Sequence, residues 1–138
     1  AWYEYDAKDL SGIHAANAIG KNAEEVFKTL VARGGRSGIH VFCIPVCCEL
    51  DLKKAAKAAG DKSIEMISVK ELLPLTGYIR GGCSPIGMKK LFPTFFHESA
   101  LEQDFVIVSG GKRGFQIKCE PKLLASACKG QFADIIFD

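Results

Sequence analysis

A single lysine interrupts an apolar stretch at residues 26–31, and a lysine in such a setting can take part in chemistry. If the stretch forms a strand, its period of two places Lys28 on one face between Val26 and Leu30. An ammonium group among apolar neighbours must find a partner or reach water, because an unpaired buried charge is very costly. Enzymes keep functional lysines in such settings. The same residues also fit a helix over residues 23–30, where a lysine near the C-terminus would only favour the helix dipole.

Two glycine-rich segments are further candidates for a binding site. Residues 76–87 contain four glycines and one proline, so a regular element is not expected there. Such a loop lets a ligand approach the backbone and leaves amides free to donate, although its spacing matches no Walker loop or dinucleotide fingerprint. Residues 109–114 predict a hairpin turn that carries the Ser109 hydroxyl, several free amides and two cations. This turn is either a solvated tip or a contact for an anion or a substrate end.

The composition is that of an ordinary globular protein. The chain has 138 residues, of which 48% are hydrophobic and 25% charged, so we expect residues 1–138 to form a single domain. A formal net charge of +2 does not by itself indicate a nucleic-acid partner. No apolar run is long enough to cross a membrane and the first residues do not resemble a secretory signal, which predicts a cytoplasmic location.

The cysteines do not predict a metal site. None of the six forms a Cys-x-x-Cys pair or has a histidine at zinc-finger spacing. Cys43, Cys119 and Cys128 lie in apolar stretches and are expected in the core, whereas the adjacent Cys47 and Cys48 could be reactive. Free thiols, no metal and no cofactor are therefore expected.

Irregularly mixed strands and helices predict an α+β fold around a curved, mostly antiparallel sheet. A glycine-rich turn at residues 34–38 would join the first two strands in a hairpin. A Ser68–Glu71 capping box would begin a brief helix that Pro74 ends. Strands are expected over residues 26–32, 39–46, 64–67, 92–96, 105–108, 115–119 and 132–137, and helices over residues 12–20, 52–59 and 121–128, with a turn or short helix at 98–103.

Three segments together resemble one known family. They are residues 25–31 (Glu-Val-Phe-Lys-Thr-Leu-Val), residues 76–87 (Thr-Gly-Tyr-Ile-Arg-Gly-Gly-Cys-Ser-Pro-Ile-Gly) and residues 108–114 (Val-Ser-Gly-Gly-Lys-Arg-Gly). In this order and spacing they resemble the YbaK/EbsC family, the Cys-tRNA(Pro) deacylases related to the editing domain inserted in bacterial prolyl-tRNA synthetase. The resemblance implies a barrel-like sheet with surrounding helices. It also implies a pocket for the aminoacylated 3′ end of tRNA(Pro), with prolyl-tRNA synthetase as a further partner.

The resemblance also assigns roles to individual residues. Lys28 matches the essential lysine of the family, Ser109 matches its pocket serine, and Gly81 matches a glycine beside the acyl ester, so these three are the expected catalytic residues. Gln116 stands where many members carry an acidic residue, which would weaken recognition of the substrate's amino group or change which amino acid is preferred. The expected substrate-binding residues are Tyr3, Thr29, Gly82, Ser84 and Gln116.

The family mechanism of the cysteine-specific members is assisted by the substrate. The thiol of the misattached cysteine attacks its own ester, so the protein need not supply a nucleophile and Cys83 is expected to be a spectator. Amides near Gly81 and Gly82 would stabilise the oxyanion, and Lys28 would orient the terminal ribose or the adjacent phosphate. Two alternatives stay open: deacylation of another misacylated tRNA such as Ala-tRNA(Pro), and a noncatalytic module that binds tRNA or a synthetase.

Overall fold

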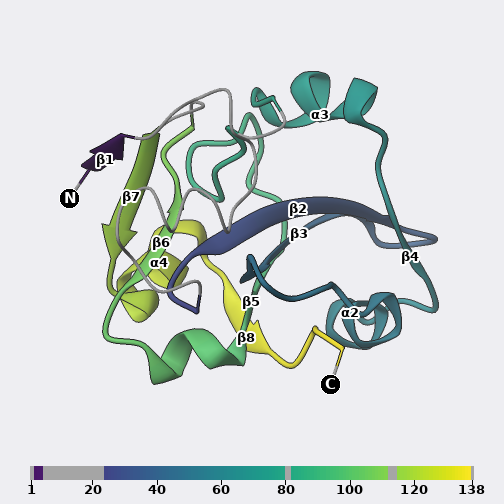
Figure 1. Ribbon diagram of the computed structural model, residues 1–138. Coiled ribbons are helices and arrows are strands. Elements are labelled where there is room, and N and C mark those ends of the chain that lie inside the picture. Colours follow the sequence, from purple (N-terminus) through teal and green to yellow (C-terminus); the bar gives the residue numbers. More distant parts are fainter. Residues whose placement is uncertain (1, 5–23, 80–81, 112–114, 138) are drawn as a thin grey trace.

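The computed structural model describes residues 2–4, 24–79, 82–111 and 115–137 (Figure 1). The helix expected over residues 12–20 and the catalytic candidate Gly81 lie outside these ranges. The described strands form two sheets, a five-stranded one of order β4-β2-β3-β5-β8 and a three-stranded one of order β1-β7-β6. The α+β prediction is confirmed, but these sheets do not close into a barrel. The strands are β1 (Trp2–Glu4), β2 (Phe27–Gly34), β3 (Gly38–Pro45), β4 (Ile64–Met66), β5 (Thr94–His97), β6 (Val106–Ser109), β7 (Phe115–Cys119) and β8 (Gln131–Ala133).

The predicted hairpin is present as β2 and β3. The two strands pair antiparallel from Phe27 opposite Pro45 to Gly34 opposite Gly38. Gly38 has a φ of 80°, a left-handed conformation that glycine adopts without strain. The alternative of a helix over residues 23–30 is therefore wrong. The strand is favoured because apolar side chains on its two faces are buried in two separate clusters.

Helix α2 (Leu52–Ala59) begins and ends as its local signals predict. The Asp51 side chain accepts hydrogen bonds from the backbone N–H groups of Lys53 and Lys54, and Gly60 ends the helix in a left-handed conformation. Ala55 and Ala56 are buried against the sheet, whereas Lys53 and Lys57 are exposed. The helix therefore presents a basic outer face.

Helix α3 (Val69–Thr76) continues past the proline that was expected to end it. The capping box at its start is present, with the Ser68 N–H donating to Glu71 Oε2 at 3.0 Å. Pro74 removes one backbone donor, but the Gly77 N–H still donates to the Leu73 carbonyl at 2.9 Å. The helix ends only at Gly77, where φ is 86°, so the prediction of an end at Pro74 is wrong.

The C-terminal half contains the short helix η1 (Glu98–Glu102), a 3-10 turn, and helix α4 (Pro121–Cys128). Strand β5 pairs parallel with β3 on one side and with β8 on the other. The strand expected over residues 132–137 ends earlier, at Ala133, because only an isolated bridge between Ile136 and Leu50 follows.

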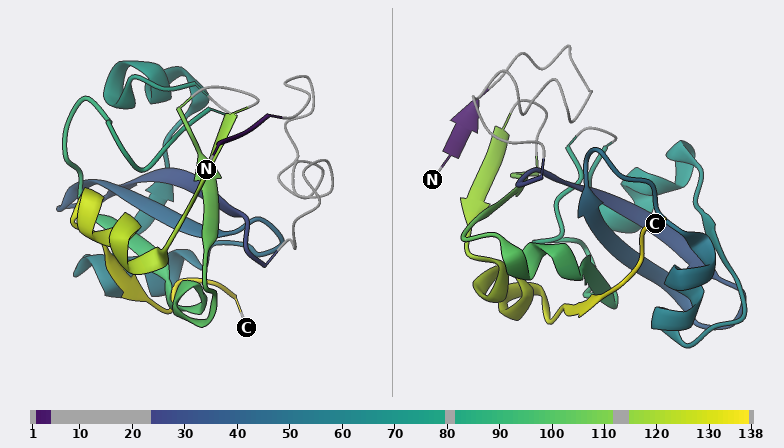
Figure 2. Two further views of the ribbon diagram at one scale, coloured as in Figure 1. Left: turned by 90° about the vertical axis from the view of Figure 1, so that its left-hand side faces the viewer. Right: turned by 60° about the horizontal axis from the view of Figure 1, so that its bottom comes forward.

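The two sheets cross at a steep angle, as Figures 1 and 2 show. Helices α2 and α3 lie on opposite faces of the β2–β3 hairpin (Figure 1): Ala55 and Ala56 of α2 join one buried cluster, and Leu72 of α3 packs against the other. None of the helices in the described ranges is long and apolar enough to span a bilayer.

Candidate functional site

Lys28 lies on the face of β2 that is covered by α2. It stands opposite Ile44 in the hairpin register, and Leu30, two residues further along β2, packs against the same cluster as Ile44. That cluster also contains Ala55 and Ala56 of α2. The Lys28 side chain is half-buried, so it is neither a fully solvated surface lysine nor an enclosed charge.

Thr29 lies on the opposite face of β2 from Lys28, as the strand period requires. Its Oγ1 atom is 3.7 Å from the Sγ atom of Cys43. Thr29 also helps to line a hollow of about 170 Å³, together with Leu72 and Cys83. The two neighbours therefore leave the strand in different directions, and a ligand could contact both only across the edge of β2.

The edge of β2 away from β3 is open between Lys28 and Leu30 among the described residues. On this side β4 pairs only with Ala32, Arg33 and Gly34. The Ile67 N–H also donates to the Val31 carbonyl at 3.3 Å, and an isolated bridge lies at the start of the strand. An unpaired strand edge presents backbone donors and acceptors to whatever lies against it, and the described residues supply no strand partner for this stretch.

The bridge at the start of β2 relates Lys28 to Ser109. Val26 pairs parallel with Ile107 of β6, and the Ile107 N–H donates to the Glu25 carbonyl at 2.7 Å. Val26 and Ile107 share one buried cluster and hence one side of the strands. Lys28 follows Val26 by two positions, and Ser109 follows Ile107 by two positions. Both side chains therefore leave their strands on that same side, and the two strands diverge beyond the bridge.

Ser109 belongs to a row of residues across the smaller sheet. It pairs with Gln116 of β7, which in turn pairs with Tyr3 of β1. The row therefore brings together three residues that the resemblance to the family assigned to the site. The Ser109 Oγ accepts a hydrogen bond from the Gly111 N–H at 3.2 Å, so the hydroxyl hydrogen can still be donated to a ligand.

Gln116 is buried with an unsatisfied acceptor. Its side chain is only 5% exposed, and its Oε1 atom has no hydrogen-bond partner among the described residues. A buried carbonyl oxygen without a donor is unfavourable by about 1–3 kcal/mol. Such an atom next to Ser109 is suited to accept a hydrogen bond from a bound ligand.

The glycine-rich loop is folded on itself, and its amides are less free than the sequence suggested. The Gly82 N–H donates to the Ile79 carbonyl at 2.9 Å. The Ser84 Oγ accepts from the Ile86 N–H at 3.2 Å. In the other turn the Gly110 N–H donates to the Phe115 carbonyl at 2.9 Å. The Gly82 amide is therefore not free to bind an oxyanion, whereas Gly81, the other glycine of that expectation, lies outside the described residues.

Tyr78 joins the two glycine-rich segments and was not singled out from the sequence. Its hydroxyl donates to the Ile86 carbonyl at 2.5 Å. Its ring lies so close to Gly111 that a Cβ atom there would stand 2.9 Å from Tyr78 Cε1. The only sequence signal was its place between glycines, since a contact across more than thirty residues leaves no local pattern.

The cysteines near the site are not activated nucleophiles. Cys83 is buried, and burial raises the pKa of its thiol to about 12. Cys48 is half-buried, and burial is also the main reason why its pKa is raised, although the nearby charge of Lys28 acts in the opposite direction. The Sγ atoms of Cys47 and Cys48 are 3.8 Å apart. A thiol with a raised pKa is a poor nucleophile at neutral pH.

The model of one protein family, the aminoacyl-tRNA editing domain, matches residues 9–126 and so includes all three motifs. The chain belongs to this family. The resemblance carried by the motifs is thereby confirmed, and with it the prediction of an aminoacyl-tRNA editing enzyme.

Relatives of this editing domain span most of its length. It is 50% identical over 135 residues to "Putative Cys-tRNA(Pro)/Cys-tRNA(Cys) deacylase EbsC" of Enterococcus faecalis, which covers 98% of this chain and 80% of that protein. YwhH of Bacillus subtilis, described as uncharacterized, is 26% identical over 122 residues, or 88% of this chain and 77% of that protein. A crystal structure of "a putative trans-editing enzyme for prolyl tRNA synthetase" matches with a TM-score of 0.90 at 28% identity, covering 99% of this chain and 86% of that one.

One group of potential metal ligands occurs in the described part of the editing domain. The ligand atoms of His97, Glu98 and Asp134 lie within 4.8 Å of one another. However, the Ser99 N–H donates to His97 Nδ1 at 3.2 Å, which leaves the hydrogen of the neutral ring on Nε2, 3.5 Å from Asp134 Oδ1. Asp134 also pairs with Lys54 at 3.1 Å. These three residues are therefore better explained as contacts that join β5 to the C-terminal segment than as the ligands of a metal ion.

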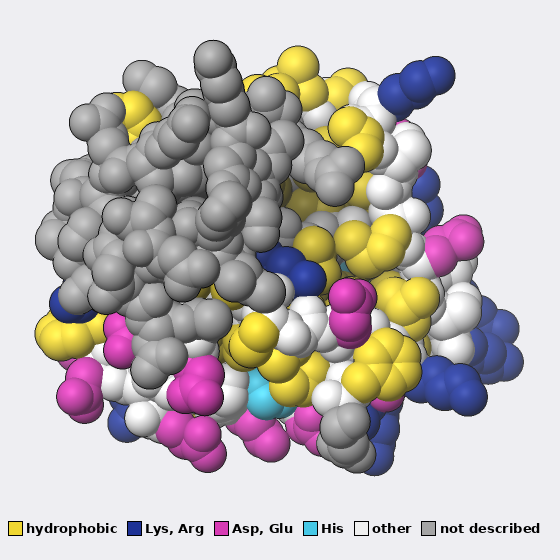
Figure 3. Space-filling model, viewed as in Figure 1, with side chains coloured by type: hydrophobic (Ala, Val, Ile, Leu, Met, Phe, Trp, Pro, Cys, Tyr) yellow, Lys and Arg dark blue, Asp and Glu magenta, His cyan; other side chains and the backbone are white. Residues whose placement is uncertain are grey.

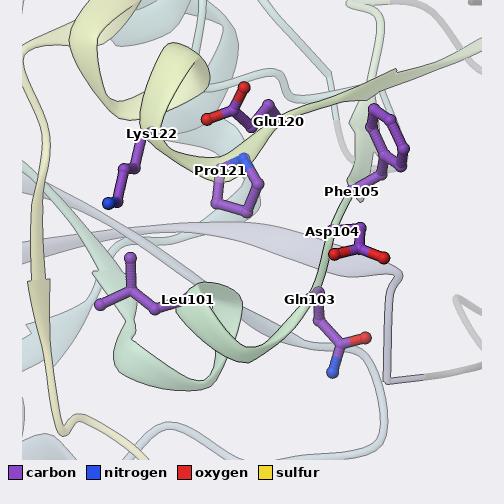
Figure 4. Close-up of a pocket in the computed structure, with 7 residues that line it drawn as sticks. All are labelled: Leu101, Gln103, Asp104, Phe105, Glu120, Pro121 and Lys122. Carbon is purple, nitrogen blue, oxygen red and sulfur yellow. The ribbon is translucent and has the colours of Figure 1, made fainter.

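A larger groove of about 470 Å³ lies between η1 and the start of α4 (Figure 4). Phe105 and Pro121 supply apolar surface, and the carboxylates of Asp104 and Glu120 lie beside them with Lys122. None of the site residues expected from the sequence lines this groove. Its two carboxylates disfavour the phosphates of RNA, so the edge of β2 remains the candidate site.

Proposed function

We propose that this chain is a trans-editing deacylase that hydrolyses mischarged Cys-tRNA(Pro). Its family supports the reaction class, and the name of the E. faecalis relative supports the amino acid and the tRNA. The observation that carries the proposal is the Val26–Ile107 bridge, which sets Lys28 and Ser109 on the same side of two diverging strands. Prolyl-tRNA synthetase would supply the mischarged substrate.

Each polar group at this place has a task in the proposed reaction. The Lys28 ammonium would hold the terminal ribose or the adjacent phosphate. The Ser109 hydroxyl, already fixed by the Gly111 N–H, would donate its hydrogen to the ester carbonyl oxygen. The unpaired Gln116 Oε1 would accept a hydrogen bond from the substrate's α-ammonium group. Further contacts to the 3′ end are proposed for Tyr3, Thr29, Gly81, Gly82 and Ser84.

The bond chemistry is supplied by the substrate in this proposal. The sulfur of the attached cysteine attacks its own ester carbonyl, the bond to the ribose oxygen breaks, and the thiol proton passes to that oxygen. The products are uncharged tRNA and a cyclic thiolactone, which water then opens to cysteine. The protein contributes by holding the thiol in attack geometry, a proximity effect, and by stabilising the negative oxygen.

The test is the release of amino acid from charged tRNA by the wild type and by Lys28→Ala. The substrates are tRNA(Pro) charged with cysteine, alanine or proline, and tRNA(Cys) charged with cysteine. We expect rapid loss of cysteine from tRNA(Pro), reduced on the order of 10²–10³-fold by Lys28→Ala with little change in melting temperature. The matched control is Lys90→Ala, which removes an exposed lysine elsewhere and should leave the rate unchanged.

Other outcomes would change the proposal in defined ways. Release of alanine instead of cysteine from tRNA(Pro) would support the assignment as a deacylase but exclude the thiol mechanism, because alanine has no thiol. Equal rates for the two cysteinyl-tRNAs would exclude discrimination by tRNA. A fully active Lys28→Ala protein would refute the role of Lys28, and no release from any substrate would leave only a binding module.

A further inference from the structure

Four cations lie along α2, just after its end, and at the turn of the β2–β3 hairpin. We call Arg36, Lys53, Lys57 and Lys62 the cationic corner; all four are exposed. Lys53 and Lys57 are four residues apart on α2 and therefore share one side of the helix. Lys62 follows the end of α2, and Arg36 lies at the hairpin tip, so two separate segments contribute to the corner.

Asp61 holds these two segments together. Its Oδ2 atom accepts hydrogen bonds from the backbone N–H groups of Arg36 and Ser37 at 3.0 and 2.8 Å, and its Oδ1 atom accepts from the Lys62 N–H at 2.6 Å. The Ser37 hydroxyl and these amides hold the pKa of the Asp61 carboxyl well below its usual range. Its charge is thus satisfied by fixed donors, while the side chains of Arg36 and Lys62 extend from a rigid base.

The charges of the protein are unevenly distributed. Basic side chains gather at the right-hand margin of Figure 3 and acidic ones at its lower left. Four of the exposed carboxylates in the described residues lie in and around η1 and the start of α4, namely Glu98, Glu102, Asp104 and Glu120, whereas Glu24, Glu49, Glu65 and Asp134 lie elsewhere. On the far face of the hairpin, Arg33 is paired with Glu71 at 2.8 Å. The modest net charge of +2 therefore does not describe each part of the surface, because local groups of one sign occur on it.

Helix α2, which carries Lys53 and Lys57, covers the face of the larger sheet on which Lys28 lies. Lys28 is on the α2 side of β2 because Leu30 and Ala32, at the same strand period, belong to the cluster of α2. From Lys28 to Gly34 the strand advances six residues, or about 20 Å. A polyanion whose end is held at Lys28 can extend over this face to the corner, whereas a single charged nucleoside cannot.

We infer that the cationic corner binds the phosphate backbone of the acceptor stem whose 3′ end reaches Lys28. The identity of the RNA in this inference rests on the proposed function. Lysines on a helix face and a turn are suited to phosphates and carry no base readout. The corner would thus set the direction in which the RNA leaves the site, away from the carboxylates beside α4.

The first test is the binding of uncharged tRNA(Pro), followed by fluorescence anisotropy at a series of salt concentrations. We compare the wild type with a triple variant, Lys53→Ala, Lys57→Ala and Lys62→Ala. The matched control is a second triple variant, which combines Lys70→Ala, Lys90→Ala and Lys122→Ala and removes three exposed lysines elsewhere. The slope of log K against log salt is negative, and each lost phosphate contact reduces its magnitude by about 0.9. We expect the corner variant to reduce the magnitude of the slope by about 2–3, and the control to leave it unchanged.

The second test separates binding from chemistry. For charged full-length tRNA we expect the corner variant to raise KM on the order of tenfold without changing kcat. For a charged acceptor-end fragment that lacks the stem, the variant and the wild type should be equal. Unchanged slope and KM in the corner variant, or equal losses in the control, would overturn the inference. Salt-dependent binding that needs the corner, without any amino-acid release, would refute the deacylase proposal alone.

Discussion

Two polar groups of the candidate site are incompletely hydrogen-bonded within the described protein. The Ser109 hydroxyl accepts one hydrogen bond from Gly111 and keeps its own hydrogen for donation, and the Gln116 Oε1 atom has no donor. A buried acceptor in this state makes the folded protein less stable than it would be with an apolar side chain. Its presence is explained if a substrate supplies the missing donor.

Gln116→Met tests this explanation, since methionine has a similar length and no hydrogen-bonding requirement. We expect the free energy of unfolding to rise by about 1 kcal/mol, because the unsatisfied oxygen is removed. We also expect KM for charged tRNA to rise, because the substrate's ammonium group loses its acceptor. Urea titration measures the first effect and steady-state deacylation the second. A less stable variant with unchanged KM would show that Gln116 is a structural residue.

Cys83→Ser tests whether the thiol within the glycine-rich loop takes part in the reaction. The buried Cys83 thiol, with a pKa of about 12, is protonated at neutral pH. We therefore expect the variant to keep most of its deacylase activity and to lose some stability, because a hydroxyl replaces a thiol in an apolar cluster. Single-turnover deacylation on Cys-tRNA(Pro) is the measurement. Abolished activity in a folded variant would make Cys83 the nucleophile.

The sequence was informative about side chains of the candidate site and misleading about its backbone. Lys28 and Ser109 match family motifs and Gln116 departs from one, and the structure places all three on strands that are connected by pairing or by the Val26–Ile107 bridge. Free amides were expected in the two glycine-rich segments. The Gly82 N–H instead donates to the Ile79 carbonyl, and the Gly110 N–H donates to the Phe115 carbonyl. Residue types do not determine which backbone groups a loop satisfies internally, since that depends on how the loop closes.

Elements with strong local signals were predicted well. Helix α2 has Asp51 at its start and Gly60 at its end, and the hairpin has its glycine turn, so both are decided within a few residues. The end of α3 was misplaced because Pro74 removes only one hydrogen bond, and the following turn is kept by Gly77. The end of β8 depends on pairing with β5, which is not encoded locally.

Gly111→Ala tests the contact between the two glycine-rich segments. Gly111 has a φ of 98°, and an added Cβ atom would push against the Tyr78 ring, whose hydroxyl is held by Ile86. Gly38→Ala is the matched control, since its φ is 80° but a Cβ atom there would meet nothing within 4 Å.

Both of these substitutions should destabilise the protein by about 1–2 kcal/mol through the left-handed backbone. Only Gly111→Ala should also displace Tyr78 and thereby lower kcat at saturating tRNA. Thermal unfolding and kcat are measured for both variants. Equal kcat values would mean that the packing of Tyr78 against Gly111 does not position the site.

At the scale of the whole molecule, the candidate site depends on how two sheets meet. The sequence predicted the fold class and most strands but not their division into two sheets. It also gave no sign that β6 contacts the first residues of β2, because Val26 and Ile107 are far apart in the chain. Pairings of this kind are selected by the packing of the complete core, where Val106, Ile107 and Val108 are almost fully buried.

Ile107→Ala tests whether the junction of the sheets positions Lys28 and Ser109 for the proposed reaction. Ile107 is 0% exposed and packs with Val26 and Val46, so its truncation leaves a void at the place from which Lys28 and Ser109 diverge. The control is Ile135→Ala, which empties an equally buried position in the cluster beneath α2. Each substitution should destabilise the protein by about 2–5 kcal/mol.

The two variants should differ in catalysis if the junction matters. At a temperature where both remain folded, Ile107→Ala should reduce kcat, because the distance between Lys28 and Ser109 is no longer fixed, and Ile135→Ala should keep it. Circular dichroism establishes folding and deacylation of Cys-tRNA(Pro) gives kcat. Equal losses would attribute the effect to stability alone. A selective loss in Ile107→Ala would show that an apolar contact between two sheets keeps the polar groups of the site in register.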